Sequence, residues 1–298
     1  MSATRFELRV GEPDYPACLT LSPRPPKVLY GIGDPHALRP GLGVIGSRKA
    51  TPYGLACARR FAGWAAEHGV TVVSGAAIGC DLAAQRAALE AGAPTVAVLG
   101  CGADVDYPRR ASDLLAALRG GSGAVVSEFC WGVPPMRGHF PARNRIIAAL
   151  SAAVLVVEAA LPSGTFSTAD HALAAGRAVL AVPGSVLFAG SAGCNRLLRQ
   201  GAGVVGCIED LADELADAGL LDGCLASAMS GDPPTLDACV ASGDPVLRAV
   251  LSDPVSPDAA ALALGMEPAE LLRHLSRLEM RGWIARYPDG KYGPCARR

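Results

Sequence analysis

The sequence predicts an α/β protein: a doubly wound parallel sheet of the extended Rossmann-like type, with a small winged-helix domain at the C-terminal end. Three observations lead to this fold class. From residue 43 onward, short apolar runs alternate with amphipathic helical segments. The apolar runs are rich in Val, Leu and Ala without polar alternation, as in strands buried on both faces. After residue 218 the composition changes, and a second pattern of short helices follows.

The first segment, 1–42, is rich in proline, and Tyr15-Pro16 and Pro23-Arg24-Pro25-Pro26 favour extended or turn structure over helix. We expect it to be an N-terminal extension that packs on the core. Residues 43–218 then form the Rossmann-like domain. Its expected strands are 42–45, 70–73, 95–99, 124–126, 154–157 and 179–182. Its expected helices are 54–67, 82–91, 113–118, one that begins at Pro141, 167–175 and 208–218.

The C-terminal segment has the pattern of a winged helix. Residues 219–243 are rich in Gly, Asp, Pro and Ser and are expected to be an acidic, flexible linker. Within 244–298 we expect three helices, at 246–251, 257–264 and 269–281. A hairpin with strands at 283–286 and 291–293 follows them. The third helix is expected to expose Arg273, His274 and Arg277 to duplex DNA or to a partner protein, and the weak local charge does not decide between the two.

The net charge of −1 conceals an uneven distribution along the chain. Residues 1–206 carry +6, residues 207–258 carry −10, and residues 259–298 carry +3. Two basic bodies joined by an acidic connector are compatible with DNA binding by either body.

The composition favours a protein of the reducing cytoplasm without metal or cofactor. None of the ten cysteines stands in Cys-x-x-Cys spacing, and most lie inside apolar runs, as small buried side chains do. The chain has no apolar run of 18 residues and no charged-then-apolar leader at Met1, so we expect neither a membrane span nor a secretory signal. The usual glycine-rich fingerprints for triphosphates and dinucleotides are absent from the sequence.

Glycine and hydroxyl residues gather where the predicted strands end. In a doubly wound sheet, ligands bind at the carboxyl ends of the strands. Glycine lets a backbone N–H approach a phosphate closely, and Ser and Thr add donors. Each loop alone is ordinary loop chemistry, but five on one rim indicate a groove for a phosphodiester backbone or a nucleotide. The five are Gly46-Ser47-Arg48, Ser74-Gly75, Gly100-Cys101-Gly102, Ser127-Glu128 and Ser163-Gly164-Thr165.

Arg143 and Arg145 fall in the first turn of the helix expected to begin at Pro141, where the helix dipole disfavours cations. They indicate an anion above the helix end. Alternatively, Glu128 or Glu158 pairs with them. Asp81, Glu128 and Glu158 lack a neighbouring histidine in sequence, so we expect loop or ion-pair roles and no catalysis. The aromatic side chains expected to stack on bases are Trp131, Phe140 and Phe166, and for Phe140 and Phe166 packing in the core is the alternative.

An ordered series of motifs between Tyr15 and Ala202 resembles the DNA-processing protein A (DprA/Smf) family. The series comprises Gly46-Ser47-Arg48, Ser74-Gly75, Gly79-Cys80-Asp81, Phe140–Ile147, Val156–Ala159, Ser163–Thr165, Val182-Pro183-Gly184 and Gly193-Cys194-Asn195. The resemblance implies a non-catalytic homodimer that binds and protects single-stranded DNA and helps to load RecA in natural transformation or recombination. The DNA-binding residues carried over by position are Gly46, Ser47, Arg48, Ser74, Gly75, Asp81, Phe140, Arg143, Asn144, Arg145, Ser163, Gly164 and Thr165.

The chain departs from the family pattern at two positions, because Ile78 and Pro162 stand where basic residues are usual. Two other functions remain open. One is a nucleotide-processing enzyme of the lysine-decarboxylase-like Rossmann type, although Pro162-Ser163-Gly164-Thr165 lacks the double glycine of its phosphate loop. The other is a transcription regulator that senses a ligand through the α/β domain and binds duplex DNA through the winged helix.

Overall fold

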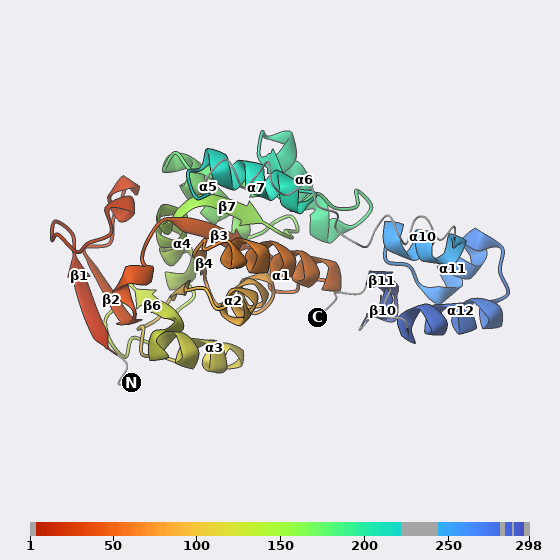
Figure 1. Ribbon diagram of the computed structural model, residues 1–298, viewed down its shortest axis with the longest axis horizontal. Helices are drawn as coiled ribbons and strands as arrows, with labels where there is room; N and C mark the ends of the chain where they lie inside the picture. Colours follow the sequence, from red (N-terminus) through yellow and green to blue (C-terminus); the bar gives the residue numbers. More distant parts are fainter. Residues whose placement is uncertain (1–3, 222–243, 281–283, 288, 295–298) are drawn as a thin grey trace. The chain divides into compact units, whose positions relative to one another are not determined.

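The computed structural model describes residues 4–221, 244–280, 284–287 and 289–294, and these residues form two compact units (Figure 1). Most of the expected linker at 219–243 lies outside the described residues. The larger unit contains a nine-stranded sheet in the order β1-β2-β6-β5-β4-β3-β7-β8-β9. The strands are β1 Arg5–Arg9, β2 Val28–Gly33, β3 Gly41–Ile45, β4 Val72–Ser74, β5 Thr95–Val98, β6 Gly123–Ser127, β7 Ser151–Val156, β8 Ala178–Ala181 and β9 Gly203–Val204.

In sheet order, the strands β6-β5-β4-β3-β7-β8-β9 all pair in parallel with their neighbours. Strand β2 pairs with β6 in antiparallel orientation, and β1 pairs with β2 in the same way at the edge of the sheet. The helices that accompany the sheet are α1 Pro52–Glu67, α2 Cys80–Glu90, α3 Ser112–Ala117, α4 His139–Leu150, α5 Thr165–Ala174, α6 Ala192–Arg199 and α7 Ile208–Asp217. The predicted doubly wound α/β fold is therefore confirmed.

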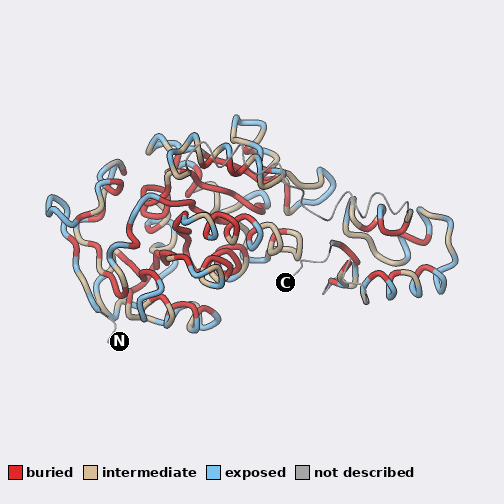
Figure 2. The backbone as a smooth tube through the Cα atoms, viewed as in Figure 1, coloured by how far each residue is buried: buried red, intermediate tan, exposed pale blue. Residues whose placement is uncertain are grey.

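The central strands β3, β4, β5, β6 and β7 are buried on both faces of the sheet (Figure 2). Successive side chains of a strand point to opposite faces, and β5 shows the consequence directly. Val96 and Val98 belong to a core cluster with α4, α5 and α6, whereas Ala97 belongs to a second cluster with α2 and α3. This double burial explains why the strands carry Val, Leu and Ala without polar alternation. Each fully buried Val or Leu contributes about 1.5–3 kcal/mol.

The second unit is a winged helix, as the sequence predicts. Its elements are α10 Pro245–Ser252, α11 Pro257–Leu264, α12 Pro268–Met280, β10 Ile284–Arg286 and β11 Tyr292–Pro294. Asp244 caps α10 by accepting from the N–H groups of Val246 and Leu247, and the Ser256 hydroxyl caps α11. The apolar faces of the three helices meet in one core with Ile284 and Tyr292 of the hairpin.

The structure corrects three local expectations. The proline-rich segment contributes β1 and β2 to the sheet, so it is more than an extension that packs on the core. Helix α4 begins at His139 rather than at Pro141, which moves Arg143 and Arg145 out of its first turn. The elements α6 and β9 have no counterpart in the sequence prediction. Among the described helices, none combines the length and the apolar character that crossing a bilayer requires.

Candidate functional site

The site lies at the point where the strand order of the sheet changes direction. Strands β3 and β7 are neighbours, with β4, β5 and β6 following on one side and β8 and β9 on the other. In an open α/β sheet, the loops that leave two such strands diverge and open a crevice at their carboxyl ends. Here these loops carry Gly46-Ser47-Arg48 after β3 and Ser163-Gly164-Thr165 before α5.

Gly46 is required because the backbone passes close to two other loops. A Cβ at this position would lie 2.6 Å from the Sγ of Cys80 and 3.1 Å from the carbonyl oxygen of Glu158. The next residue ties the same loops together, since the Ser47 N–H donates to Glu158 O at 2.7 Å and Ser47 O accepts from the Cys80 N–H at 3.3 Å. The turn thereby leaves Arg48 exposed at the rim.

Arg143 lies beneath the rim and not on it. Its side chain is buried, with 4% of the residue exposed, and its guanidinium donates to the carbonyl oxygens of Gly75 and Val98. Gly75 makes this possible, because a Cβ there would lie 2.2 Å from the guanidinium nitrogens. Burial lowers the pKa of Arg143, and the nearby charge of Asp81 opposes that shift. Arg143 therefore joins α4 to the ends of β4 and β5.

Asp81 and Ser74 are also buried parts of the framework. Asp81 accepts from the Gly75 N–H at 3.2 Å, and burial raises its pKa against the attraction of Arg143. The Ser74 hydroxyl donates to Val44 O at 2.6 Å. Phosphate contacts by the side chains of Ser74, Asp81 and Arg143, as the sequence predicts, do not fit this placement, because these groups face inward and are already hydrogen-bonded.

Arg145 is paired with a carboxylate. Its guanidinium makes a bidentate ion pair with Glu128, at 2.6 and 3.0 Å, and the two side chains are only 14% and 18% exposed. For Arg145 the structure therefore shows pairing with Glu128, which the sequence left open as the alternative to a bound anion. For Arg143 the partners are backbone carbonyls and the Asn144 side-chain oxygen, at 3.1 Å, in place of a glutamate.

Three side chains come together above this framework: Arg48 and Tyr107 are exposed and stand in loops, and Phe140 is half-buried in the first turn of α4. The Arg48 guanidinium carbon lies 5.5 Å from the centre of the Phe140 ring, within cation–π range. The ring of Tyr107 lies 5.6 Å from that of Phe140, at 42° to it. Phe140 rests on the backbone of Gly100, where a Cβ would approach its ring to 3.0 Å. We call Arg48, Tyr107 and Phe140 the rim cluster.

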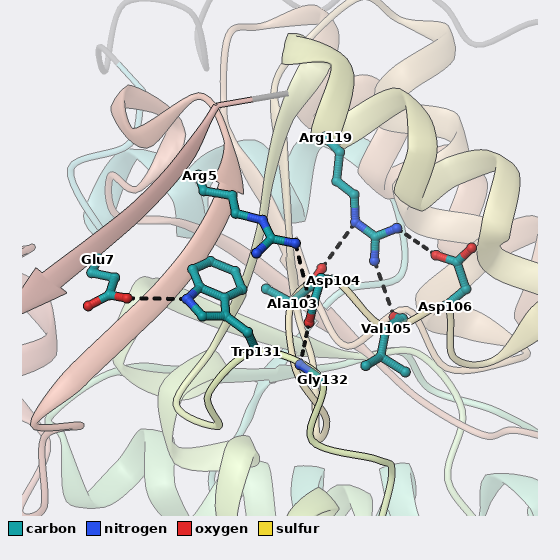
Figure 3. A network of polar contacts seen from close by, with 9 residues as sticks. All are labelled: Arg5, Glu7, Ala103, Asp104, Val105, Asp106, Arg119, Trp131 and Gly132. Carbon is teal, nitrogen blue, oxygen red and sulfur yellow. Dashed lines mark hydrogen bonds and ion pairs between the residues drawn. The ribbon is translucent and has the colours of Figure 1, made fainter. Parts of the chain in front are cut away.

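Tyr107 was missed by the sequence reasoning, although a Tyr-Pro pair after a glycine-rich strand end is a usable signal. It is 40% exposed. The loop that carries it is fixed by Arg119, which donates to the carbonyl oxygens of Ala103 and Val105 and pairs with Asp106 at 2.5 Å (Figure 3). The three residues that Arg119 contacts lie just before Tyr107 in the sequence, so these contacts fix the loop that carries the ring.

The same network accounts for Trp131, which the sequence allowed as a base-stacking residue. Its indole lies 4.7 Å below the Arg5 guanidinium and donates to Glu7 at 3.2 Å (Figure 3). Asp104 accepts from the Gly132 N–H at 2.8 Å and pairs with Arg5 at 3.4 Å. Trp131 thus anchors β1 to the loop after β6.

The loop before α5 presents polar groups to solvent. The Ser163 hydroxyl accepts from the Thr165 N–H at 3.2 Å and donates to its hydroxyl at 2.9 Å. Gly164 is exposed, and a Cβ there would meet no atom within 4 Å. The N–H groups of Thr165, Phe166 and Ser167 already donate to Ser163 and Gly164, so the start of α5 offers an anion its partial positive charge beside the exposed Gly164. Phe166 packs partly against the core and lies 6.0 Å from Arg196.

Two other candidate sites are weaker than the rim. Within the described part of the chain, no three His, Cys, Asp or Glu side chains come together as metal ligands would. In the winged helix, Arg273 and Arg277 are exposed, but His274 pairs with Asp244 at 2.6 Å and so belongs to the contacts that hold α10 to α12.

Comparisons with known proteins point in one direction. A family model described as "DNA recombination-mediator protein A" matches residues 7–216, and one described as "DprA winged helix domain" matches residues 223–290. The chain is 41% identical over 280 residues to Protein Smf of Escherichia coli K12, covering 93% of this chain and 74% of that protein. It is 40% identical over 190 residues to DNA processing protein DprA of Streptococcus pneumoniae R6, covering 63% and 67% of the two chains.

Solved structures agree. That of DNA processing protein A from Streptococcus pneumoniae superposes with a TM-score of 0.67 at 37% identity, over 70% of this chain and 74% of that one. A structure described as showing the single-stranded DNA binding mode of DNA processing protein A from Helicobacter pylori superposes with a TM-score of 0.65 at 30% identity. It covers 72% of this chain and 96% of the other.

Proposed function

This chain belongs to the DprA/Smf family of DNA-processing proteins, and from that premise we propose that it binds single-stranded DNA across the rim cluster with little sequence preference. The observation that carries the proposal is the arrangement of Arg48, Tyr107 and Phe140 where the sheet changes direction. Single-strand binders combine cations that neutralise the backbone with aromatic rings on which bases stack. The rim cluster places the exposed Arg48 and Tyr107 beside the half-buried ring of Phe140.

The backbone of the rim supplies further contacts for phosphate. The N-terminal end of a helix carries partial positive charge, and α5 begins at the Ser163-Gly164-Thr165 loop, in which Gly164 is exposed. Contacts of this type fix the strand without distinguishing its sequence. Stacking is also tolerant, because every base has an aromatic face.

The buried residues beneath the rim would keep this surface in shape. Arg143, Asp81 and Ser74 hold the loops after β4 and β5 through hydrogen bonds to the backbone. We propose no catalytic step for this protein, in line with the inward, hydrogen-bonded placement of Asp81. Dimer formation and the loading of RecA, which the family resemblance implies, are further parts of the proposal.

The nucleotide-processing enzyme and the ligand-sensing regulator are not favoured by the family assignment. They also predict different behaviour. The enzyme would release free base from nucleoside monophosphates, and the regulator would bind one duplex sequence tightly through its isolated C-terminal domain.

A titration of labelled oligothymidylate, followed by fluorescence anisotropy, tests the proposal. We expect saturable binding, and an oligonucleotide of the same length but of mixed sequence should bind with a similar affinity. Arg48→Ala and Phe140→Ala should each weaken it roughly ten-fold, since a charge-assisted contact or a stacked base contributes about 1.5–3 kcal/mol. Arg137→Ala, which removes an exposed charge from the segment before α4, is the matched control. Equal affinities for the wild-type protein and both rim variants would contradict the proposal.

A further inference from the structure

A pocket of about 310 Å³ lies beside the rim, lined by Arg24, Pro141, Ala142, Arg145, Ser167 and His171. Its walls come from the proline-rich segment, from the first turns of α4 and from α5. Two arginines and a histidine thus converge from three separate elements, and none of the lining residues is acidic. This distribution of charge is suited to an anion.

The charges around the pocket are only partly balanced. Arg145 is paired with Glu128, which does not line the pocket. His171 has its pKa lowered by burial first and then by the positive charges of Arg145 and Arg24, with Asp170 acting in the opposite direction. A bound anion would relieve the repulsion between the two arginines and would favour the charged form of His171.

The elements that line the pocket are held in place. The buried Tyr15 donates through its hydroxyl to Pro26 O at 2.8 Å, which ties down the proline-rich segment on both sides of Arg24. Ser167 and His171 are four residues apart on α5, so their side chains leave the same face of the helix. A hydroxyl and an imidazole can therefore donate to one ligand.

The pocket continues the rim in the direction of α5. Pro141 follows Phe140 of the rim cluster directly, and Ser167 stands two residues after Thr165. We propose that this pocket is a second phosphate subsite, in which Arg24, Ser167 and His171 bind a phosphodiester of the DNA strand that crosses the rim. The proposal rests on single-strand binding at the rim and extends its footprint; neither the sequence motifs nor the comparisons assign these three residues to DNA.

Oligothymidylates of two lengths separate the subsite from the rim. One of about 6 nucleotides should occupy the rim alone, and one of about 16 nucleotides should also reach the pocket, given that single-strand sites span about 4–16 nucleotides. We expect the double variant Arg24→Ala/His171→Gln to bind the short strand like the wild type and the long strand roughly ten-fold more weakly. Arg9→Ala removes a positive charge from the same N-terminal segment, where Arg9 pairs with Glu7 at 3.2 Å, and should change neither affinity.

The outcomes distinguish the two proposals. If the wild-type protein fails to bind either strand, single-strand binding at the rim is wrong and the subsite falls with it. If the long strand binds the double variant as tightly as the wild type, the subsite alone is overturned. Because Arg24 is exposed, Arg24→Ala by itself gives the same test without risk to folding.

Two further measurements identify the ligand. Long-strand affinity should rise several-fold as the pH falls from about 7.5 to about 5.5 in the wild type and stay flat in His171→Gln, because a phosphate favours the charged imidazole. A free nucleoside monophosphate is the other source of the same chemistry. If the double variant lost saturable binding of thymidine monophosphate but kept its long-strand affinity, the pocket would belong to a nucleotide and the DNA assignment would be refuted.

Discussion

Replacing Arg143 with alanine is expected to destabilise the α/β unit without changing how its DNA affinity depends on salt. The guanidinium is buried and donates to the carbonyl oxygens of Gly75 and Val98. The substitution leaves both oxygens buried without this donor, and it removes the positive charge that partly offsets the burial of Asp81. Arg143 is thus a framework residue in spite of its place in an arginine-rich motif.

The size of the effect follows from these contacts. A buried acceptor left without its partner costs about 1–3 kcal/mol, and Arg143 donates to two of them, while the loss of its charge also leaves Asp81 less compensated. The two effects overlap, so we expect a loss of about 3–5 kcal/mol in the free energy of unfolding. For a unit of this size, that corresponds to a fall in Tm of roughly 6–20 °C.

Urea unfolding monitored by circular dichroism measures this loss. Arg145→Ala is the informative comparison, because its partner Glu128 is 18% exposed and can be reached by water after the substitution, so the expected loss is smaller, about 1.5–3 kcal/mol. Arg137→Ala, at an exposed position, should leave stability unchanged. If Arg143→Ala kept wild-type stability and lost single-strand affinity with a shallower salt slope, the side chain would be a phosphate ligand and the structural reasoning would be refuted.

Three more predictions concern the surface of the molecule. Tyr107→Ala should weaken single-strand binding roughly ten-fold, at about 1–3 kcal/mol per stacked base, whereas Tyr107→Phe should preserve it; equal losses in both variants would argue against stacking. Ile78 is 39% exposed, so Ile78→Arg should leave the unfolding midpoint unchanged while raising affinity about ten-fold and steepening its salt dependence. An unchanged salt slope would show that the binding groove does not reach this loop. Removing residues 243–298 should leave a folded α/β unit, seen as a cooperative melt, that retains most of the single-strand affinity; full binding by the isolated C-terminal domain would contradict this.

The strands and the fold class were predictable because their signal is local. A strand buried on both faces needs apolar side chains at every position, and 154–157 shows that pattern without reference to any partner. The first two strands were not predictable in the same way. Prolines flank them in sequence, and what makes Arg5–Arg9 and Val28–Gly33 into strands is their antiparallel pairing with each other and with β6.

The glycine- and hydroxyl-rich loops do lie at the carboxyl ends of the strands, but the direction of individual side chains could not be predicted. Gly75 lacks a Cβ, and that absence leaves room for the guanidinium of Arg143, which turns inward from α4. A contact between residues 68 positions apart leaves no local pattern in the sequence. Tyr107 meets Phe140 for a similar reason, since only the folded loop after β5 brings the two rings together.

The salt dependence of single-strand affinity, measured for the wild type and for Arg48→Ala, tests single-strand binding at the rim most directly. The slope of log affinity against log salt concentration should be negative, and its magnitude should be about 0.7 for each phosphate that the protein neutralises. Removing Arg48 should make the slope shallower by about 0.7, while Arg137→Ala keeps it at the wild-type value. A slope near zero in the wild type, or the same slope with and without Arg48, would contradict the assignment of the rim as the DNA-binding surface.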